Sequence, residues 1–239
     1  MMQARSAFAG ALALSLLTLV GCGGSTSSTQ SASSSAATPS ASAPAAAPEQ
    51  VAHADNRPRV VFLGDSITAG LGLPPEQAYP TLIQQKVDAE SLGYHVVNAG
   101  VSGDTSAGGL SRLDWALDGD VRVMVVGLGG NDGLRGLPPE ELRKNLATII
   151  ERAQARKIAV VLAGMEAPPN FGQTYTVAFR QVYADLATQY GVPLIPFLLQ
   201  GVAGIEGLNQ RDGIHPTAEG ARAVADNVWT VLRPTLKGS

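Results

Sequence analysis

Cysteine, aromatic residues and charge are all scarce in this chain. One cysteine, Cys22, occurs among 239 residues, so no disulfide can form within the chain. Aromatic residues make up 5% and charged residues 15% of the sequence, and the formal net charge is −3 at pH 7. The lack of a basic excess excludes the electrostatic footprint of a nucleic-acid-binding protein, and we expect no nucleic-acid partner. A folded domain here must be stabilised by its apolar core alone.

The apolar run near the N-terminus is too short for a mature membrane-spanning helix. Residues 7–20 form a run of about 14 residues that follows Arg5, which is typical of an export signal. The run ends in Leu19-Val20-Gly21-Cys22, which resembles the lipobox of bacterial lipoproteins. We therefore predict a lipoprotein signal peptide over residues 1–21 and lipidation of Cys22. A plain secretory signal with an incidental cysteine is the alternative.

Large apolar residues are almost absent from the next segment. Residues 22–57 consist mainly of Ser, Ala, Pro and Thr, so they cannot bury enough surface to offset their chain entropy. We predict a disordered tether that holds the following domain on the order of 30 Å from its anchor. Gly23 after the cysteine indicates, by resemblance to the sorting rule of Gram-negative lipoproteins, an outer-membrane anchor facing the periplasm. A soluble periplasmic or secreted protein is the alternative.

From Arg59 onward, apolar β-branched segments alternate with longer amphipathic segments. This alternation predicts an α/β domain over residues 58–239, with a parallel sheet and helices on both of its faces. The segments predicted as strands are 59–63, 95–99, 121–128, 158–165 and 192–195. The segments predicted as helices are 79–92, 105–117, 138–156, 175–190 and 217–232.

In such sheets, ligands bind beyond the carboxyl ends of the strands. The turns that follow the first three predicted strands are 64–68, 100–106 and 129–132, and they are rich in Gly, Ser, Asp and Asn. The first turn offers the hydroxyl of Ser66. The N–H groups of Ser66 and Gly103 and the amide of Asn131 could together form an oxyanion hole. Asp104 and Asp132 are expected to brace their loops by bonding backbone amides.

A serine hydroxyl needs a base, and the chain has three histidines. His53 lies in the predicted tether, and His95 lies at the amino end of the second strand. His215 remains, three residues after Asp212. We therefore predict Ser66 as nucleophile, His215 as base and Asp212 as the residue that orients the imidazole.

At this point the chain resembles the SGNH hydrolases, also called the GDSL family. Gly64-Asp65-Ser66-Ile67 matches the first sequence block of that family. The segments 98–106, 129–132 and 212–216 resemble the second, third and fifth blocks, in the right order. Several stretches, including Pro169-Asn170-Phe171-Gly172, look like a subgroup of bacterial periplasmic thioesterases, arylesterases and lysophospholipases.

The resemblance implies a flavodoxin-like three-layer sandwich with a five-stranded parallel sheet. It assigns the four signature roles to Ser66, Gly103, Asn131 and His215, with Asp212 completing the triad. The implied reaction is hydrolysis of a small acyl-ester substrate through an acyl-enzyme: an aryl ester, a short- to medium-chain ester or thioester, or a lysophospholipid. The reaction implies no metal or cofactor. We expect a monomer that meets the membrane through its N-terminal lipid anchor.

The loops after the third and fourth strands are expected to rim the active site. Side chains there that could contact an acyl chain are Leu134, Leu137, Pro168, Pro169, Phe171 and Tyr175. Simple anchoring of the loops explains these residues equally well. Two other functions also stay open: a carbohydrate or peptidoglycan O-acetylesterase of the same fold, and an envelope binding protein with an inactive site.

Overall fold

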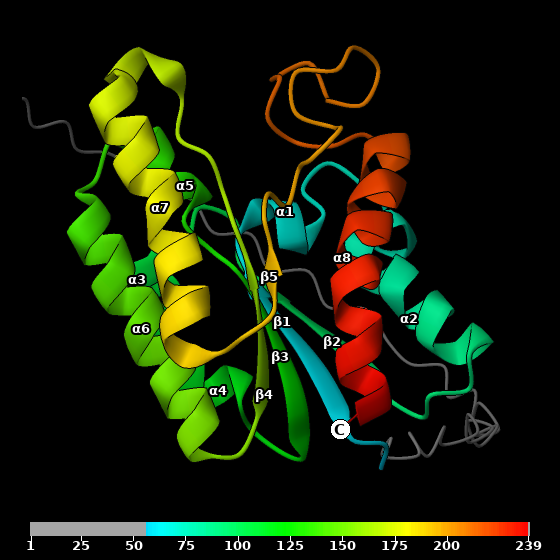
Figure 1. The fold of residues 1–239 in the computed structure, drawn as a ribbon. Coiled ribbons are helices and arrows are strands. Elements are labelled where there is room, and N and C mark those ends of the chain that lie inside the picture. The colour runs from blue at the N-terminus through cyan, green and yellow to red at the C-terminus, as the bar shows by residue number, and fades with distance from the viewer. Residues whose placement is uncertain (1–55, 239) are drawn as a thin grey trace, which may run out of the picture. The chain divides into compact units, whose positions relative to one another are not determined.

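A five-stranded parallel sheet forms the centre of the folded domain. The structure, a computed structural model, describes residues 56–238. The strand order is β2-β1-β3-β4-β5, and every neighbouring pair is parallel (Figure 1). The predicted α/β class is therefore confirmed. The strands are β1 (Arg59–Gly64), β2 (His95–Gly100), β3 (Val121–Gly127), β4 (Ala159–Ala163) and β5 (Leu194–Ile195).

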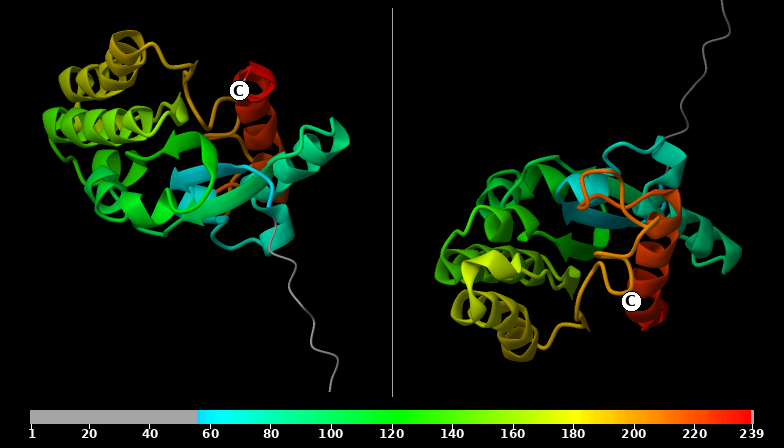
Figure 2. Two further views of the ribbon diagram at one scale, coloured as in Figure 1. Left: turned by 90° about the horizontal axis from the view of Figure 1, so that it is seen from below. Right: turned by 90° about the horizontal axis from the view of Figure 1, so that it is seen from above.

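Helices cover both faces of this sheet, which makes three layers (Figures 1 and 2). On one face α2 (Tyr79–Ala89) packs against α8 (Ala218–Gly238). On the other face α6 (Pro139–Ala155) packs against both α7 (Gln173–Tyr190) and α3 (Ser106–Ser111). The shorter elements are α1 (Ser66–Ala69), η1 (Pro75–Gln77), α4 (Leu113–Ala116), α5 (Gly130–Leu134) and η2 (Pro169–Phe171).

The core lies between the sheet and these helices. The central strands are buried on both faces, as their continuous apolar sequences predict. Residues 60–63 of β1 and 123–126 of β3 are at most 1% exposed. Helix α6 contributes an apolar stripe with helical spacing, made of Leu142, Leu146, Ile149, Ile150 and Ala153.

The first three strands end at the same level of the sheet. Gly64, the last residue of β1, pairs with Gly100 of β2 on one side and with Gly127 of β3 on the other. The turns that follow these strands therefore emerge side by side at the carboxyl edge. Helices α1 and α5 begin directly at this edge (Figure 1).

The helix predicted over 79–92 ends three residues early, at Ala89, and two other predicted helices differ more from those in the structure. The helix predicted over 105–117 is interrupted at Arg112 and forms the separate helices α3 and α4. Two consecutive glycines, Gly108 and Gly109, weaken helical propensity there, and a Cβ at Gly109 would lie 2.2 Å from the Leu128 side chain. The last helix continues past the predicted end at residue 232, through Pro234, because Leu236 is still buried in the core.

Segments before residue 56 lie outside the described residues, and these include the predicted signal peptide, Cys22 and most of the predicted tether. Across the described range 56–238, no helix has both the length and the apolar character needed to cross a membrane.

The end of β2 packs directly on the backbone of α1, which yields a test of this arrangement. A Cβ at Gly100 would lie 2.3 Å from the Ala69 backbone nitrogen, and backbone atoms cannot swing aside as a side-chain tip can. We expect Gly100→Ala to lower the free energy of unfolding by about 2 kcal/mol. Urea denaturation measures this. Gly238→Ala is the control because a Cβ there meets open space; equal stability of the two variants would contradict the packing.

Candidate active site

The turn after β1 places a serine at the first position of a short helix. Asp65 is the N-cap of α1, and its Oδ1 accepts a hydrogen bond of 3.0 Å from the backbone N–H of Ile67. This is the capping role that the side chain of an aspartate favours. Ser66 follows as the first helical residue and is 9% exposed, so its hydroxyl is held at the surface of the core.

A loop before α8 brings a histidine to this serine across 149 positions of sequence. The Nε2 atom of His215 lies 2.8 Å from Ser66 Oγ. On the other side of the ring, Nδ1 lies 2.7 Å from Oδ2 of Asp212. The structure thus brings Ser66, His215 and Asp212 together in one hydrogen-bonded series, with Asp212 and Ser66 on opposite ring nitrogens.

Backbone donors hold Asp212 in its ionised form. Its Oδ1 accepts hydrogen bonds from the N–H groups of Ile214, at 2.9 Å, and of His215, at 3.0 Å. The bond from Ile214, together with that from the His215 ring, lowers the pKa of Asp212 to about 2. An ionised carboxylate only accepts hydrogen bonds, so His215 carries a proton on Nδ1 and presents a bare Nε2 to Ser66 when neutral. This is the tautomer that a general base needs.

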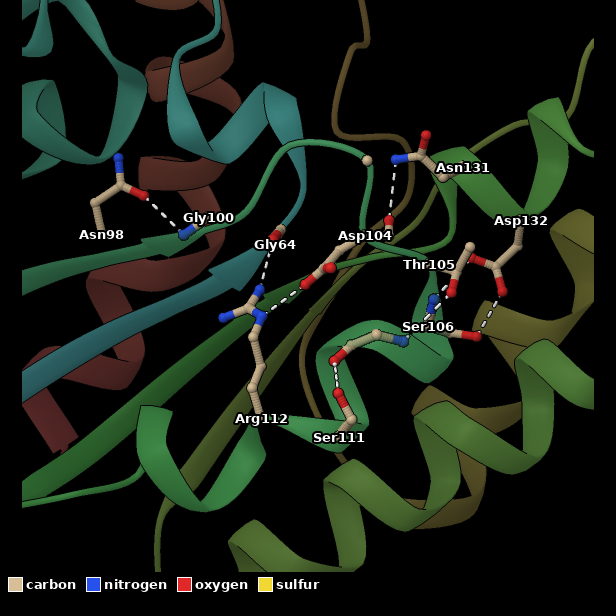
Figure 3. A network of polar contacts seen from close by, with 12 residues as sticks. Gly64, Asn98, Gly100, Asp104, Thr105, Ser106, Ser111, Arg112, Asn131 and Asp132 are labelled. Atoms are coloured by element: carbon tan, nitrogen blue, oxygen red, sulfur yellow. Dashed lines mark hydrogen bonds and ion pairs between the residues drawn. The ribbon is translucent and has the colours of Figure 1, made fainter. Parts of the chain in front are cut away.

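The two other predicted turns reach the same place. Gly103 follows β2 in the left-handed region, with φ +86°, and has open space around its missing side chain. Asn131 lies in the first turn of α5, and its Nδ2 donates a 2.9 Å hydrogen bond to the Asp104 carbonyl (Figure 3). An amide nitrogen carries two hydrogens, so one remains for a ligand. Both residues line the same cavity as Ser66 and His215.

This cavity has a volume of about 600 Å³. Apart from the hydrogen-bonded series of Ser66, His215 and Asp212, most of the side chains that line the cavity are apolar. The volume and the apolar lining suit an organic ligand fixed by a few polar groups. The apolar side chains of the lining are Ile67, Leu71, Leu134, Met165, Ala167, Pro168, Pro169, Phe197, Leu199, Ala203 and Ile214.

The residues predicted to contact an acyl chain separate into two groups. Leu134, Pro168 and Pro169 line the cavity. Leu137, Phe171 and Tyr175 do not belong to the lining, and loop anchoring describes them instead. The Tyr175 hydroxyl donates a 2.7 Å hydrogen bond to the Leu137 carbonyl, and the rings of Phe171 and Tyr175 lie 5.3 Å apart.

Sequence reasoning missed several residues of the cavity wall. Phe197 and Leu199 follow β5 at the carboxyl edge, so the rule that ligands bind beyond strand ends could have identified them. Ile214 lies between Asp212 and His215 and could have been inferred from its neighbours. Met165 follows the end of β4 and carries the same signal, whereas Leu71 carries none.

The remaining candidates lie elsewhere or brace the site. His95 pairs with Arg59 at the amino end of the sheet, far along the strands from the catalytic edge. Asp132 is buried and accepts hydrogen bonds from the backbone N–H and the hydroxyl of Ser106, at 2.8 and 2.5 Å (Figure 3). Over residues 56–238, no group of three or more His, Cys, Asp or Glu side chains is placed to hold a metal ion.

Asp65 is buried directly before Ser66 in the chain, and this gives a prediction about pH. Burial raises the pKa of Asp65 to about 6, whereas an unfolded aspartate titrates near 4. The folded chain therefore binds this proton more tightly, and the stability contributed by the neutral form is lost as the pH rises through about 6. Asp65→Asn keeps an oxygen that can cap α1 but has no proton to lose, so its stability does not fall as the pH rises through about 6.

We expect the stability of Asp65→Asn relative to wild type to rise by on the order of 2 kcal/mol between pH 4 and pH 7.5. Urea denaturation at a series of pH values measures the difference. Asp120→Asn is a matched control because Asp120 is exposed and its side chain pairs with the nearby Arg122. A stability difference for Asp65→Asn that stays constant with pH would contradict the account.

Several known proteins are similar in sequence to this chain over most of the folded domain. Esterase TesA of Pseudomonas aeruginosa is 45% identical over 178 residues, which cover 74% of this chain and 89% of that protein. Thioesterase 1/protease 1/lysophospholipase L1 of Escherichia coli is 37% identical over 178 residues, covering 74% and 84%. The arylesterase of Vibrio mimicus is 35% identical over 171 residues, covering 71% and 86%.

Solved structures show the same fold. The crystal structure of TesA superposes with a TM-score of 0.71 at 45% identity, covering 74% of this chain and 98% of that one. The SGNH-hydrolase family esterase AlinE4 gives a TM-score of 0.63 at 40% identity, covering 75% and 97%. The model of the GDSL-like lipase/acylhydrolase family matches residues 62–223. The chain therefore belongs to the GDSL-like lipase/acylhydrolase family, whose members hydrolyse ester bonds.

Proposed function

We propose that this protein is a serine esterase in which Ser66 forms the acyl-enzyme. One observation carries the proposal: Ser66 Oγ lies 2.8 Å from His215 Nε2 at the wall of an apolar cavity. A hydroxyl in contact with a bare imidazole nitrogen is an activated nucleophile, and the adjoining cavity accommodates the acyl group. The names of the relatives, which include esterases, a thioesterase and an arylesterase, support the same reaction class.

The mechanism uses two acyl transfers. His215 takes the proton of Ser66 as Oγ bonds to the ester carbonyl carbon, and the carbonyl oxygen becomes an oxyanion. The N–H groups of Ser66 and Gly103 and the amide of Asn131 are the proposed donors to that oxyanion. When the tetrahedral intermediate collapses, the bond to the leaving group breaks and His215 protonates the leaving oxygen or sulfur. His215 then takes a proton from a water molecule as the water oxygen bonds to the acyl carbon. The bond from that carbon to Ser66 Oγ breaks, His215 returns the proton to Oγ, and the acid leaves.

Asp212 stabilises the imidazolium that forms at each step. Because its pKa is about 2, Asp212 is ionised at neutral pH. It therefore compensates the positive charge on the ring without taking the proton itself.

The cavity indicates the class of substrate. Its lining includes Leu71, Leu134, Phe197, Leu199 and Ile214, so the acyl chain is in contact with hydrocarbon. Burial of such a chain contributes about 0.8 kcal/mol per methylene. We propose short- to medium-chain acyl esters, aryl esters, thioesters and lysophospholipids as substrates.

We further propose that the enzyme works in the cell envelope. The sequence Leu19-Val20-Gly21-Cys22 would place a lipid on Cys22, and Gly23 favours an outer membrane anchor facing the periplasm. The segment over residues 22–57 would then act as the tether. Substrates on this side of the inner membrane are envelope esters and lysolipids.

Replacement of the nucleophile tests the enzymatic proposal. We expect Ser66→Ala to lower kcat for p-nitrophenyl butyrate by about 10⁴-fold or more, because the acyl-enzyme can no longer form. Ser111→Ala is the control: Ser111 is exposed on α3 and its hydroxyl donates to the Gly108 carbonyl. Turnover by Ser66→Ala equal to that of Ser111→Ala, with both proteins folded by circular dichroism, would overturn the proposal.

Membrane attachment has a separate test. In cells labelled with alkyne-palmitate, we expect label on the wild-type chain and none on Cys22→Ser, since Cys22 is the only cysteine. Wild-type protein should sediment with the outer membrane after fractionation, whereas Cys22→Ser should not. Persistent labelling of Cys22→Ser would show that the lipobox prediction is wrong.

A further inference from the structure

Arg112 stands where the predicted helix over 105–117 is interrupted. It follows α3 and precedes α4, and its side chain is 17% exposed. Arg112 does not line the cavity, so it has no place in the acyl-transfer steps described above. Its guanidinium nevertheless extends toward the carboxyl edge of the sheet, where the three catalytic turns meet (Figure 3).

The guanidinium joins two of these turns. Its Nε donates a 2.6 Å hydrogen bond to Oδ2 of Asp104, in the turn after β2, and the two groups form an ion pair. Its Nη2 donates a 2.8 Å bond to the carbonyl of Gly64, the last residue of β1. The Gly64 carbonyl also accepts the N–H of Val101, at 3.0 Å. Asp104 therefore braces its loop as the sequence predicts, but through this arginine rather than through the expected backbone amides.

Asp104 extends the connection to the third turn. While its carboxylate binds Arg112, its main-chain carbonyl accepts the 2.9 Å hydrogen bond from Asn131 Nδ2 (Figure 3). Gly103 is the residue directly before Asp104, and Ser66 follows Gly64 and Asp65 in the first turn. Each proposed oxyanion donor is therefore either a member of this one network or a near neighbour of a member along the chain.

The contacts specify arginine rather than any cation. A guanidinium presents donors in a rigid plane, so Nε and Nη2 fix the distance between Asp104 and Gly64, whereas a lysine ammonium is a single point. The third nitrogen, Nη1, is buried without a hydrogen-bond partner in the part of the chain that the structure describes. Removal of this group from water offsets part of the gain from the ion pair. We therefore expect Arg112 to matter more for the placement of the three turns than for the free energy of unfolding.

We propose that Arg112 is a positioning residue that sets the spacing of the oxyanion donors on the three turns. The proposal rests on the proposed role of Ser66 in ester hydrolysis. Misplacement of donors weakens binding of the oxyanion more than binding of the neutral ester, since the charge develops only in the transition state. Loss of Arg112 therefore lowers kcat and leaves KM nearly unchanged.

The experiment is a double-substitution cycle on p-nitrophenyl butyrate hydrolysis. We expect Arg112→Gln to lower kcat by about 10- to 100-fold, with KM within about threefold of wild type. In an Asn131→Ala background, where one donor is already missing, we expect Arg112→Gln to lower kcat by a factor that is at least about threefold smaller. Arg112→Lys keeps the charge without the planar fork and falls between wild type and Arg112→Gln.

Arg156→Gln is the matched control. The Arg156 guanidinium also donates a partly buried hydrogen bond to a backbone carbonyl, at 2.5 Å to Leu117. Arg156 itself is exposed and lies at the end of α6, remote from the three turns. We expect Arg156→Gln to affect melting temperature and not kcat. Active sites are counted by titration with a fluorophosphonate, so that kcat refers to folded enzyme only.

Two results would overturn the proposal. The first is that Arg112→Gln and Arg112→Lys both have the same kcat as Arg156→Gln. The other is an effect of Arg112→Gln that is the same in the wild-type and Asn131→Ala backgrounds, which would mean that it does not act through the oxyanion donors. Lack of turnover by wild-type enzyme would instead contradict the proposed function and is therefore distinguishable.

Discussion

The active site depends on the register of three parallel strands. Gly64 pairs with Gly100 and Gly127, so β1, β2 and β3 end together and their turns leave the sheet side by side. Glycine is needed at this edge because the layers meet there: a Cβ at Gly64 would lie 2.0 Å from the Thr68 hydroxyl, and one at Gly100 would meet the α1 backbone. Turns that are far apart in the chain thereby become neighbours through the strand pairing alone.

The four aspartates around the proposed active site have different surroundings. Asp212 is ionised by its backbone donors and orients His215. Asp65 caps α1 and is buried, which raises its pKa to about 6. Asp104 and Asp132 bind Arg112 and Ser106 and thereby hold the loops (Figure 3). These acids differ in role because burial and hydrogen-bond donors differ around each.

Much of this was predictable from the sequence because it follows from local patterns. Apolar runs identified five strands and hence the parallel sheet, and the strand-end rule identified the turns that bear Ser66, Gly103 and Asn131. Asp212 and His215 could be paired because they share one turn. Their contact with Ser66 needed the fold, since 149 positions separate His215 from that serine.

What could not be predicted depends on tertiary packing. The consecutive glycines Gly108 and Gly109 are visible in the sequence, but the contacts at the break are not: Gly109 packs closely on Leu128, and Arg112 binds Asp104 and Gly64. Phe171 and Tyr175 have the composition of a substrate pocket, yet their rings pack on each other and the Tyr175 hydroxyl donates to the Leu137 carbonyl. Loop residues of this kind are apolar in either role, so composition alone does not separate them.

The central claim is that Ser66 carries the acyl group during turnover. The most direct measurement is mass spectrometry of the peptides obtained from enzyme quenched in acid during hydrolysis of p-nitrophenyl butyrate. We expect a butyryl adduct on the peptide that contains Ser66, formed in a burst stoichiometric with enzyme. An adduct on another residue, or steady turnover with no covalent intermediate on any peptide, would contradict it.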